Sequence, residues 1–222
     1  MRQFAAICEA VGATTKKLEK MRLVGDYLRS LPPEDASRAI LFLTGRPFPR
    51  FAEHVTQVGG RLIWQALGLV SGASADDMTA AYRRHGDLGG AAQELLSGNA
   101  AVDNYTLAEA AAAFRELVTR RGPAQKLDLL VQILGRVTPL EAKYLVKILS
   151  GELRIGLSEG LAEESLARAY SRPLAEIQRA NMLTGDIGET LRLAATGTLA
   201  EARLRLFHPA GFMLASAAQT AQ

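Results

Sequence analysis

The chain has 222 residues, with 26 Lys and Arg, 23 Asp and Glu, three His, one Cys and a formal net charge of +3. This length suits one large domain or two small ones, with a core that needs no covalent crosslinks. One cysteine excludes a disulfide framework and a cysteine-based zinc site, and the three histidines are scattered, so we expect no metal site. The longest uncharged run inside the body of the chain, residues 62–75, is shorter than the roughly 20 residues of a membrane-spanning helix. With no signal-peptide pattern at its start, the sequence predicts a cytoplasmic protein that does not contact a membrane.

Arginine outnumbers lysine among the basic residues, by 20 to 6. Because a guanidinium group can bind two phosphate oxygens at once, this excess favours a phosphate-containing ligand. A GC-rich coding sequence also favours arginine codons, and taken alone it explains the excess without any ligand. The modest net charge does not by itself indicate nucleic acid.

Apolar residues recur at helical spacing along almost the whole chain, and no stretch keeps an alternation of period two. Thr14 and Thr15 are candidate caps for the second helix, and Gly45 is a candidate helix stop. Thr106 and Thr138 each begin a capping box, with glutamate three residues later. The sequence therefore predicts an all-α domain of about a dozen helices, one of which begins after Thr106. The other expected helices cover residues 4–11, 18–31, 36–43, 62–69, 76–84, 127–134, 142–149, 161–170, 174–183 and 187–195.

The sequence also contains an internal similarity. Residues 16–46 align without gaps on residues 122–152, and the proline break and the glycine stop coincide as well as the apolar positions. A Gly-Asp-x-Gly segment at 86–89 recurs at 185–188, where we expect each aspartate to cap the following helix. Leu- and Ala-rich helices can align by chance, and a solenoid would need at least three shorter units. We interpret the pattern as a duplicated, pseudo-two-fold domain over residues 1–205, with halves of about 1–100 and 101–205.

Two loops and two helix starts in this repeat could bind phosphate. The loops, residues 44–50 and 150–156, each combine glycine with arginine, which lets backbone N–H groups and guanidinium groups approach an oxyanion. The helix starts, residues 15–17 and 120–126, place cations beside free N–H groups. A helix-terminating glycine beside a solvated arginine, and an ordinary solvated first turn, explain the same residues without a ligand. The chain contains neither a phosphate-binding P-loop nor a dinucleotide-binding glycine pattern.

One segment carries a resemblance to a known family. The segment Leu-Ser-Gly-Glu-Leu-Arg-Ile-Gly-Leu at residues 149–157 resembles the signature of the N-terminal DNA-binding domain of ATP-dependent DNA ligases. Lysines before the early long helix, both Gly-Asp-x-Gly segments and Gln-Lys-Leu at 125–127 follow in the family's order. The tail, residues 207–215, resembles the linker that leads into the adenylation domain, although Phe212 replaces the usual proline. Residues 206–222 are therefore expected to be that linker.

The resemblance implies a function for the chain. Such a domain binds the minor groove and the phosphates of nicked duplex DNA, largely without sequence specificity, and works with the adenylation and OB-fold domains of the same ligase in DNA replication, repair and recombination. No lysine here is followed by x-Asp-Gly, so catalytic residues, ATP and Mg²⁺ are expected in the parent ligase and not in this chain. A free-standing helical nucleic-acid-binding or scaffold protein and a helical DNA glycosylase are the alternatives, although no catalytic residue for a glycosylase was found. The expected DNA-binding residues are Gly151, Arg154, Gly156, Lys17, Gln125 and Lys126 from the family, and Gly45, Arg46 and Arg50 mainly from the repeat.

Overall fold

Helices make up most of the chain that the structure describes, and no strand occurs there. The structure is a computed structural model that describes residues 1–52, 54–99, 104–206 and 208. The predicted all-α class is confirmed, as a single domain of twelve α-helices within those residues. The helices are α1 (Arg2–Ala13), α2 (Lys17–Arg29), α3 (Pro33–Leu43), α4 (Gly60–Ser71), α5 (Ala75–His85), α6 (Leu88–Leu95), α7 (Leu107–Thr119), α8 (Gly122–Arg136), α9 (Pro139–Leu149), α10 (Glu159–Ala169), α11 (Leu174–Thr184) and α12 (Ile187–Thr196), followed by a 3-10 turn, η1 (Leu199–Glu201). Among the described residues, none of the helices is long and apolar enough to cross a bilayer.

Most of the helix starts follow from local sequence signals. Thr106 and Thr138 form the two predicted capping boxes, and Asp87 and Asp186 accept hydrogen bonds from backbone N–H groups as predicted N-caps. The prediction for Thr14 and Thr15 is wrong, since Lys16 occupies the N-cap of α2 without a side-chain cap. The hydroxyl of Thr14 accepts a hydrogen bond from the Lys16 N–H instead, which closes a turn before the helix.

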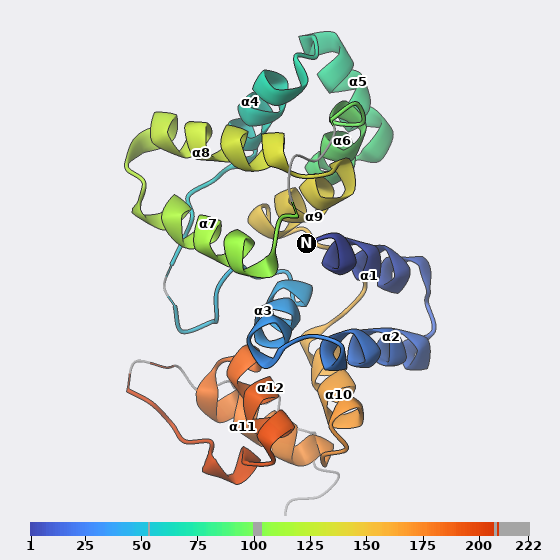
Figure 1. The fold of residues 1–222 in the computed structure, drawn as a ribbon, viewed down its shortest axis with the longest axis vertical. Coiled ribbons are helices and arrows are strands. Elements are labelled where there is room, and N and C mark those ends of the chain that lie inside the picture. The colour runs from blue at the N-terminus through green and yellow to red at the C-terminus, as the bar shows by residue number, and fades with distance from the viewer. Residues whose placement is uncertain (53, 100–103, 207, 209–222) are drawn as a thin grey trace, which may run out of the picture.

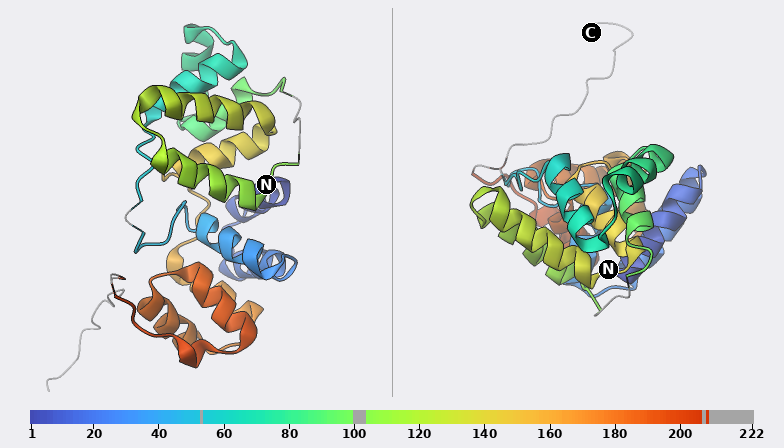
Figure 2. Two further views of the ribbon diagram at one scale, coloured as in Figure 1. Left: turned by 60° about the vertical axis from the view of Figure 1, so that its left-hand side comes forward. Right: turned by 90° about the horizontal axis from the view of Figure 1, so that it is seen from above.

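Helices near the start of the chain pack against helices near its end (Figures 1 and 2). In Figure 1, α4–α9 occupy the upper part of the molecule, whereas α2 and α3 lie beside α10–α12 in the lower part. Helix α2 packs on α10 and α3 on α12, while α8 packs on α4 and α9 on α6. Helices α2 and α3 are thus completed by α10 and α12, α1 packs on α2 and α9, and the six helices α4–α9 pack with one another.

One continuous core joins the two parts of the molecule. Phe42 on α3 lies edge-on to Phe4 on α1, with ring centroids 6.1 Å apart, and edge-on to Phe114 on α7, at 5.3 Å. Edge-to-face aromatic pairs add about 0.5–1.5 kcal/mol beyond the burial of their area. Phe42 thus links α3 of the lower part to α1 and to α7 of the upper part.

Two glycines allow neighbouring helices to approach each other closely. A Cβ atom at Gly89, in the first turn of α6, would lie 2.8 Å from the carbonyl oxygen of Lys143 on α9. A Cβ atom at Gly188, in the first turn of α12, would lie 2.9 Å from the carbonyl oxygen of Ser37 on α3. Both Gly-Asp-x-Gly segments therefore cap a helix and also bring its first turn against the backbone of a neighbouring helix.

Candidate nucleic-acid interface

The two predicted loops lie side by side in the structure. A groove of about 380 Å³ is lined by Leu43 at the end of α3, by Thr44 and Gly45 of the first loop, and by Gly151 and residues 153–158 of the second loop and the segment after it. A Cβ atom at Gly45 would lie 3.4 Å from the Cβ atom of Leu153, so the two backbones pass close to each other. Segments more than 100 residues apart in the sequence thus form one concave surface.

The second loop directs one arginine into solvent. Leu153 and Ile155 are buried, whereas the side chain of Arg154 between them is 65% exposed. Arg154 has a φ of +48°, a left-handed conformation that is uncommon for a residue other than glycine. Its guanidinium group lies 3.3 Å from the carboxylate of Glu152 at the surface. The alternation of buried and exposed side chains fixes the place of this cation at the groove.

A buried lysine holds the second loop from beneath. The ammonium group of Lys20 on α2 donates hydrogen bonds to the carbonyl oxygens of Ile155, at 2.6 Å, and Gly156, at 3.1 Å. Gly156 has a φ of +67°, and a Cβ atom there would lie 2.5 Å from the Lys20 Nζ. The positive φ favours glycine at this point, and any side chain there would displace the ammonium group of Lys20.

Lys126 on α8 holds a segment of the first half of the chain in a similar way. Its side chain is buried, with the residue only 4% exposed, and its ammonium group donates to the carbonyl oxygen of Thr56 at 2.7 Å and to the Oε1 of Gln57 at 3.3 Å. The structure thus places this predicted DNA-binding lysine inside the protein, where it holds the segment that follows the first loop. Neighbouring Gln125 accepts a hydrogen bond from the Arg121 N–H and closes the start of α8.

The two arginines of the first loop both point to one carboxylate. Arg50 donates to Glu159, the first residue of α10, and Arg46 lies 3.6 Å from the same carboxylate oxygen. Lys17, at the start of α2, forms an ion pair of 2.7 Å with Glu164, also on α10. Each predicted cation near α10 therefore has an acidic neighbour, which sequence reasoning did not anticipate.

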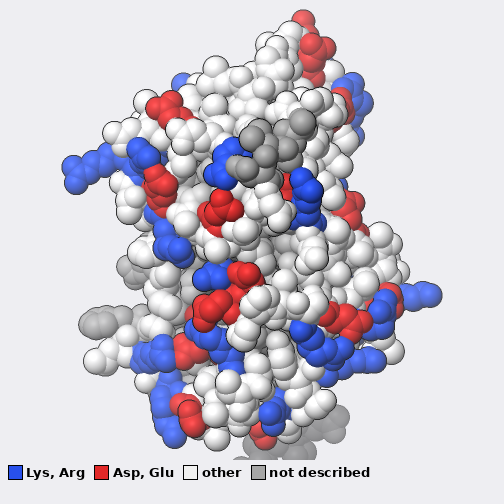
Figure 3. Space-filling model, in the orientation of Figure 1, with Lys and Arg blue, Asp and Glu red and all other residues white. Residues whose placement is uncertain are grey.

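One face of the molecule carries charges of both signs. On the face shown in Figure 3, Lys and Arg side chains alternate with Asp and Glu over the whole height of the molecule. A long-range attraction from net charge is accordingly weak, and a phosphate would have to be recognised locally by particular side chains and backbone groups.

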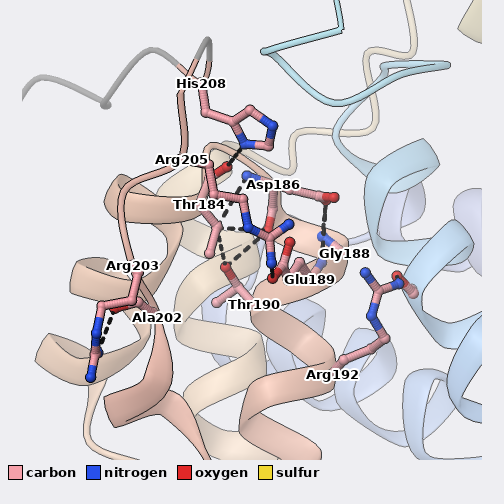
Figure 4. A network of polar contacts seen from close by, with 11 residues as sticks. Thr184, Asp186, Gly188, Glu189, Thr190, Arg192, Ala202, Arg203, Arg205 and His208 are labelled. Carbon is pink, nitrogen blue, oxygen red and sulfur yellow. Dashed lines mark hydrogen bonds and ion pairs between the residues drawn. The ribbon is translucent and has the colours of Figure 1, made fainter.

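The chain beyond η1 packs against the end of α11 and the start of α12 (Figure 4). Arg205 forms an ion pair of 2.5 Å with Glu189 on α12, and the His208 Nδ1 lies 3.0 Å from the carbonyl oxygen of Thr184 at the end of α11. The His208 ring also stacks on Phe51, with centroids 3.6 Å apart and planes 8° from parallel. His208 near the C-terminus therefore contacts Phe51, the residue directly after the first loop. The remainder of the linker-like tail, Phe207 and residues 209–222, lies outside the described residues.

Comparison with known proteins identifies the family. The family model for the DNA ligase N terminus matches residues 1–167. The chain belongs to the DNA ligase N-terminal family. This ligase domain is 52% identical over its whole length to a probable DNA ligase of Koribacter versatilis, of which it covers 38%. It is 33% identical to a DNA ligase of Methanosphaerula palustris over 98% of the domain and 41% of that protein. It is 31% identical to a DNA ligase of Methanothermobacter thermautotrophicus, over 86% of the domain and 36% of that protein.

The ligase domain thus spans about two fifths of the length of each of these relatives, so the activity of the whole relatives is not assigned to the domain by this similarity. Among the residues that the structure describes, no group of three or more His, Cys, Asp or Glu could hold a metal ion.

Proposed function

We propose that the chain is the DNA-binding part of an ATP-dependent DNA ligase, which binds the minor groove and phosphates of nicked duplex DNA and positions the nick for sealing. The observation that carries this proposal is the convergence of two glycine- and arginine-containing loops on one groove. Contacts to phosphate and sugar fix a protein on a duplex without reading its sequence. A surface of backbone N–H groups, glycines and separate arginines suits that mode of binding.

We also propose that residues 1–205 consist of two copies of one six-helix unit. Lys20 and Lys126, which are 106 positions apart, each hold a loop of the opposite half. Gly89 and Gly188 each approach a carbonyl oxygen, and those oxygens belong to residues that are again 106 positions apart, Lys143 and Ser37. Such a pseudo-two-fold arrangement presents two related loops to a duplex, whose two strands are themselves related by local two-fold symmetry.

The proposed site divides its residues between contact and support. Arg154 and Lys17 carry exposed charges for phosphates, and Arg46 and Arg50 add a second pair of cations. The backbone at Gly45, Gly151 and Gly156 provides the close approach. Lys126 and Gln125 support the site from within, by holding the segment after the first loop and the start of α8.

Sealing requires groups that this chain does not supply. None of its six lysines stands in a Lys-x-Asp-Gly sequence, which is where ligases of this kind carry the adenylyl group. ATP and Mg²⁺ would therefore bind to an adenylation domain and an OB-fold domain joined through residues 206–222. The chain's contribution is positioning, in the cytoplasm, during replication, repair or recombination.

Binding of the isolated chain to nicked duplex DNA tests the proposal. We expect weak binding, and if about four to six phosphates are neutralised, log K should fall against log salt with a slope of roughly −4 to −5. An affinity independent of salt, or a preference of several kcal/mol for one sequence, would contradict the proposal. Labelled ATP and Mg²⁺ should give no protein–AMP adduct, and the chain should partly restore nick sealing by a ligase core that lacks this domain.

A free-standing nucleic-acid-binding or scaffold protein is the alternative function. The length of the relatives favours the ligase, because each continues well beyond the matched part. A coding sequence that continues into Lys-x-Asp-Gly within a few tens of residues would decide for the ligase, and a stop codon before it would decide for the alternative.

A further inference from the structure

One carboxylate joins the two loops of the groove. Glu159, three residues after the second loop, is the first residue of α10, and its Oε2 accepts a hydrogen bond from Arg50 of the first loop, 109 residues earlier in the chain. The Nη1 of Arg46 lies 3.6 Å from the same oxygen. Two positive side chains therefore share one negative group, and the cluster keeps a net charge of about +1 for a phosphate.

The carboxylate of Glu159 is itself held in place. Its second oxygen, Oε1, accepts a hydrogen bond of 3.2 Å from the side-chain amide of Asn181 on α11, a residue that is only 8% exposed. The same amide group donates to Glu163 one turn later on α10, at 2.8 Å. In addition, the N-terminus of α10 stabilises a negative charge in its first turn. Glu159 is thus a rigid support, fixed by two helices, for side chains of a third segment.

The two arginines retain donors for a second partner. Their side chains are 39% and 45% exposed, and each guanidinium group has five N–H bonds, of which the carboxylate uses only a part. Burial and the nearby charge of Arg50 lower the pKa of Arg46, whereas Glu159 acts in the opposite direction. Without the carboxylate, the two cations would repel each other and move apart into solvent.

We propose that Glu159 is a positioning residue for DNA binding, which fixes Arg46 and Arg50 beside the second loop so that both donate to backbone phosphates while they keep their ion pairs. This inference rests on the proposed function and adds a residue that makes no contact with DNA itself. Preorganised side chains bind more tightly because their ordering costs nothing at the moment of binding.

The substitution Glu159→Gln separates positioning from bulk charge by the sign of its effect. Removal of a negative charge near a polyanion should strengthen binding if only charge matters. Positioning requires the opposite, and we expect nicked-duplex affinity to fall by about 5-fold at 0.1 M salt, with the salt slope shallower by about 1. The matched control is Glu176→Gln, which removes the same charge from the first turn of the neighbouring helix α11 and should not weaken binding.

A double-mutant cycle assigns the effect to the two arginines. When Arg46 and Arg50 are both replaced by alanine, Glu159→Gln should cause no further loss of affinity. Glu159→Asp keeps the charge but shortens the side chain, so it should also weaken binding, and it carries the test if the glutamine variant does not fold. Tighter binding by Glu159→Gln, or an equal loss in the alanine background, would overturn the inference. If the unmodified chain shows no salt-dependent binding to nicked DNA, the proposed function itself is wrong, and the inference about Glu159 is wrong as well.

Discussion

Replacement of Gly89 by alanine should loosen the contact between α6 and α9. The new Cβ would lie 2.8 Å from the carbonyl oxygen of Lys143 and 2.5 Å from the Cγ of Lys147, where ordinary contacts begin at 3.4 Å. Lys147 cannot easily swing away, because its ammonium group forms a 3.1 Å ion pair with Asp87. Helix α6 must therefore withdraw by about 0.6 Å, a gap that forfeits a quarter or more of the dispersion energy of the atoms it separates.

Overpacking of this kind costs about 2–3 kcal/mol, with the higher helix propensity of alanine already included. For a domain of this size, the midpoint of thermal unfolding should fall by about 4–12 °C, which circular dichroism can follow. Gly188→Ala should behave alike, because its Cβ would lie 2.9 Å from a carbonyl oxygen. At exposed Gly160 in α10 no atom lies within 4 Å of a new Cβ, and Gly160→Ala should raise the midpoint slightly. Equal midpoints for the Gly89 and Gly160 variants would refute the close approach of α6 to α9.

Arg154→Glu should weaken binding to nicked DNA by on the order of 10-fold, more than Arg84→Glu does in the same titration, because only Arg154 lies at the groove. A large loss of thermal stability in the Arg154 variant would instead make that arginine structural. Asp87→Asn keeps the helix cap but loses the charge that faces Lys147, at a cost of about 1–2 kcal/mol at pH 7. Burial opposes the ionisation of Asp87, but its hydrogen bonds and the charge of Lys147 outweigh burial and lower the pKa of Asp87 from its usual 3.8. The difference in unfolding free energy between Asp87→Asn and the unchanged chain should therefore persist above about pH 4 and vanish as acid protonates Asp87 in the folded state. Urea unfolding at several pH values measures this difference, with Asp186→Asn as the control. Lys126→Met leaves the carbonyl of Thr56 without its donor and should speed amide hydrogen exchange in residues 54–58, while unchanged exchange would mean that the lysine does not hold this segment.

Short-range signals in the sequence predicted four of the helix starts correctly. Thr106, Thr138, Asp87 and Asp186 cap helices as expected, because a cap depends only on the few residues that follow it. The cap prediction at Thr14 was wrong because a threonine hydroxyl is as well suited to a turn before a helix as to the cap itself.

The charges around the groove could not be predicted in this way. Glu159 and Arg50 are 109 residues apart, and no local pattern links a first-turn glutamate to a distant arginine. Lys126 read as a surface cation because lysine is seldom buried, yet its ammonium group satisfies a carbonyl oxygen inside the protein. The lysine shared by positions 20 and 126 in the alignment of residues 16–46 with residues 122–152 was the available signal, since a solvated lysine has no reason to recur at that position.

The packing of α2 and α3 against α10 and α12 has a consequence for how the chain reaches its native state. Helices α4–α9 are contiguous in sequence and can assemble as soon as they leave the ribosome, whereas α2 and α3 must wait for α10 and α12, which follow more than 100 residues later. Contacts of such long sequence separation slow folding and leave apolar helix faces uncovered in the interval. At high protein concentration, the last three helices of a second molecule can cover those faces first. Refolding of concentrated samples should therefore yield intertwined dimers, in which each chain completes the other.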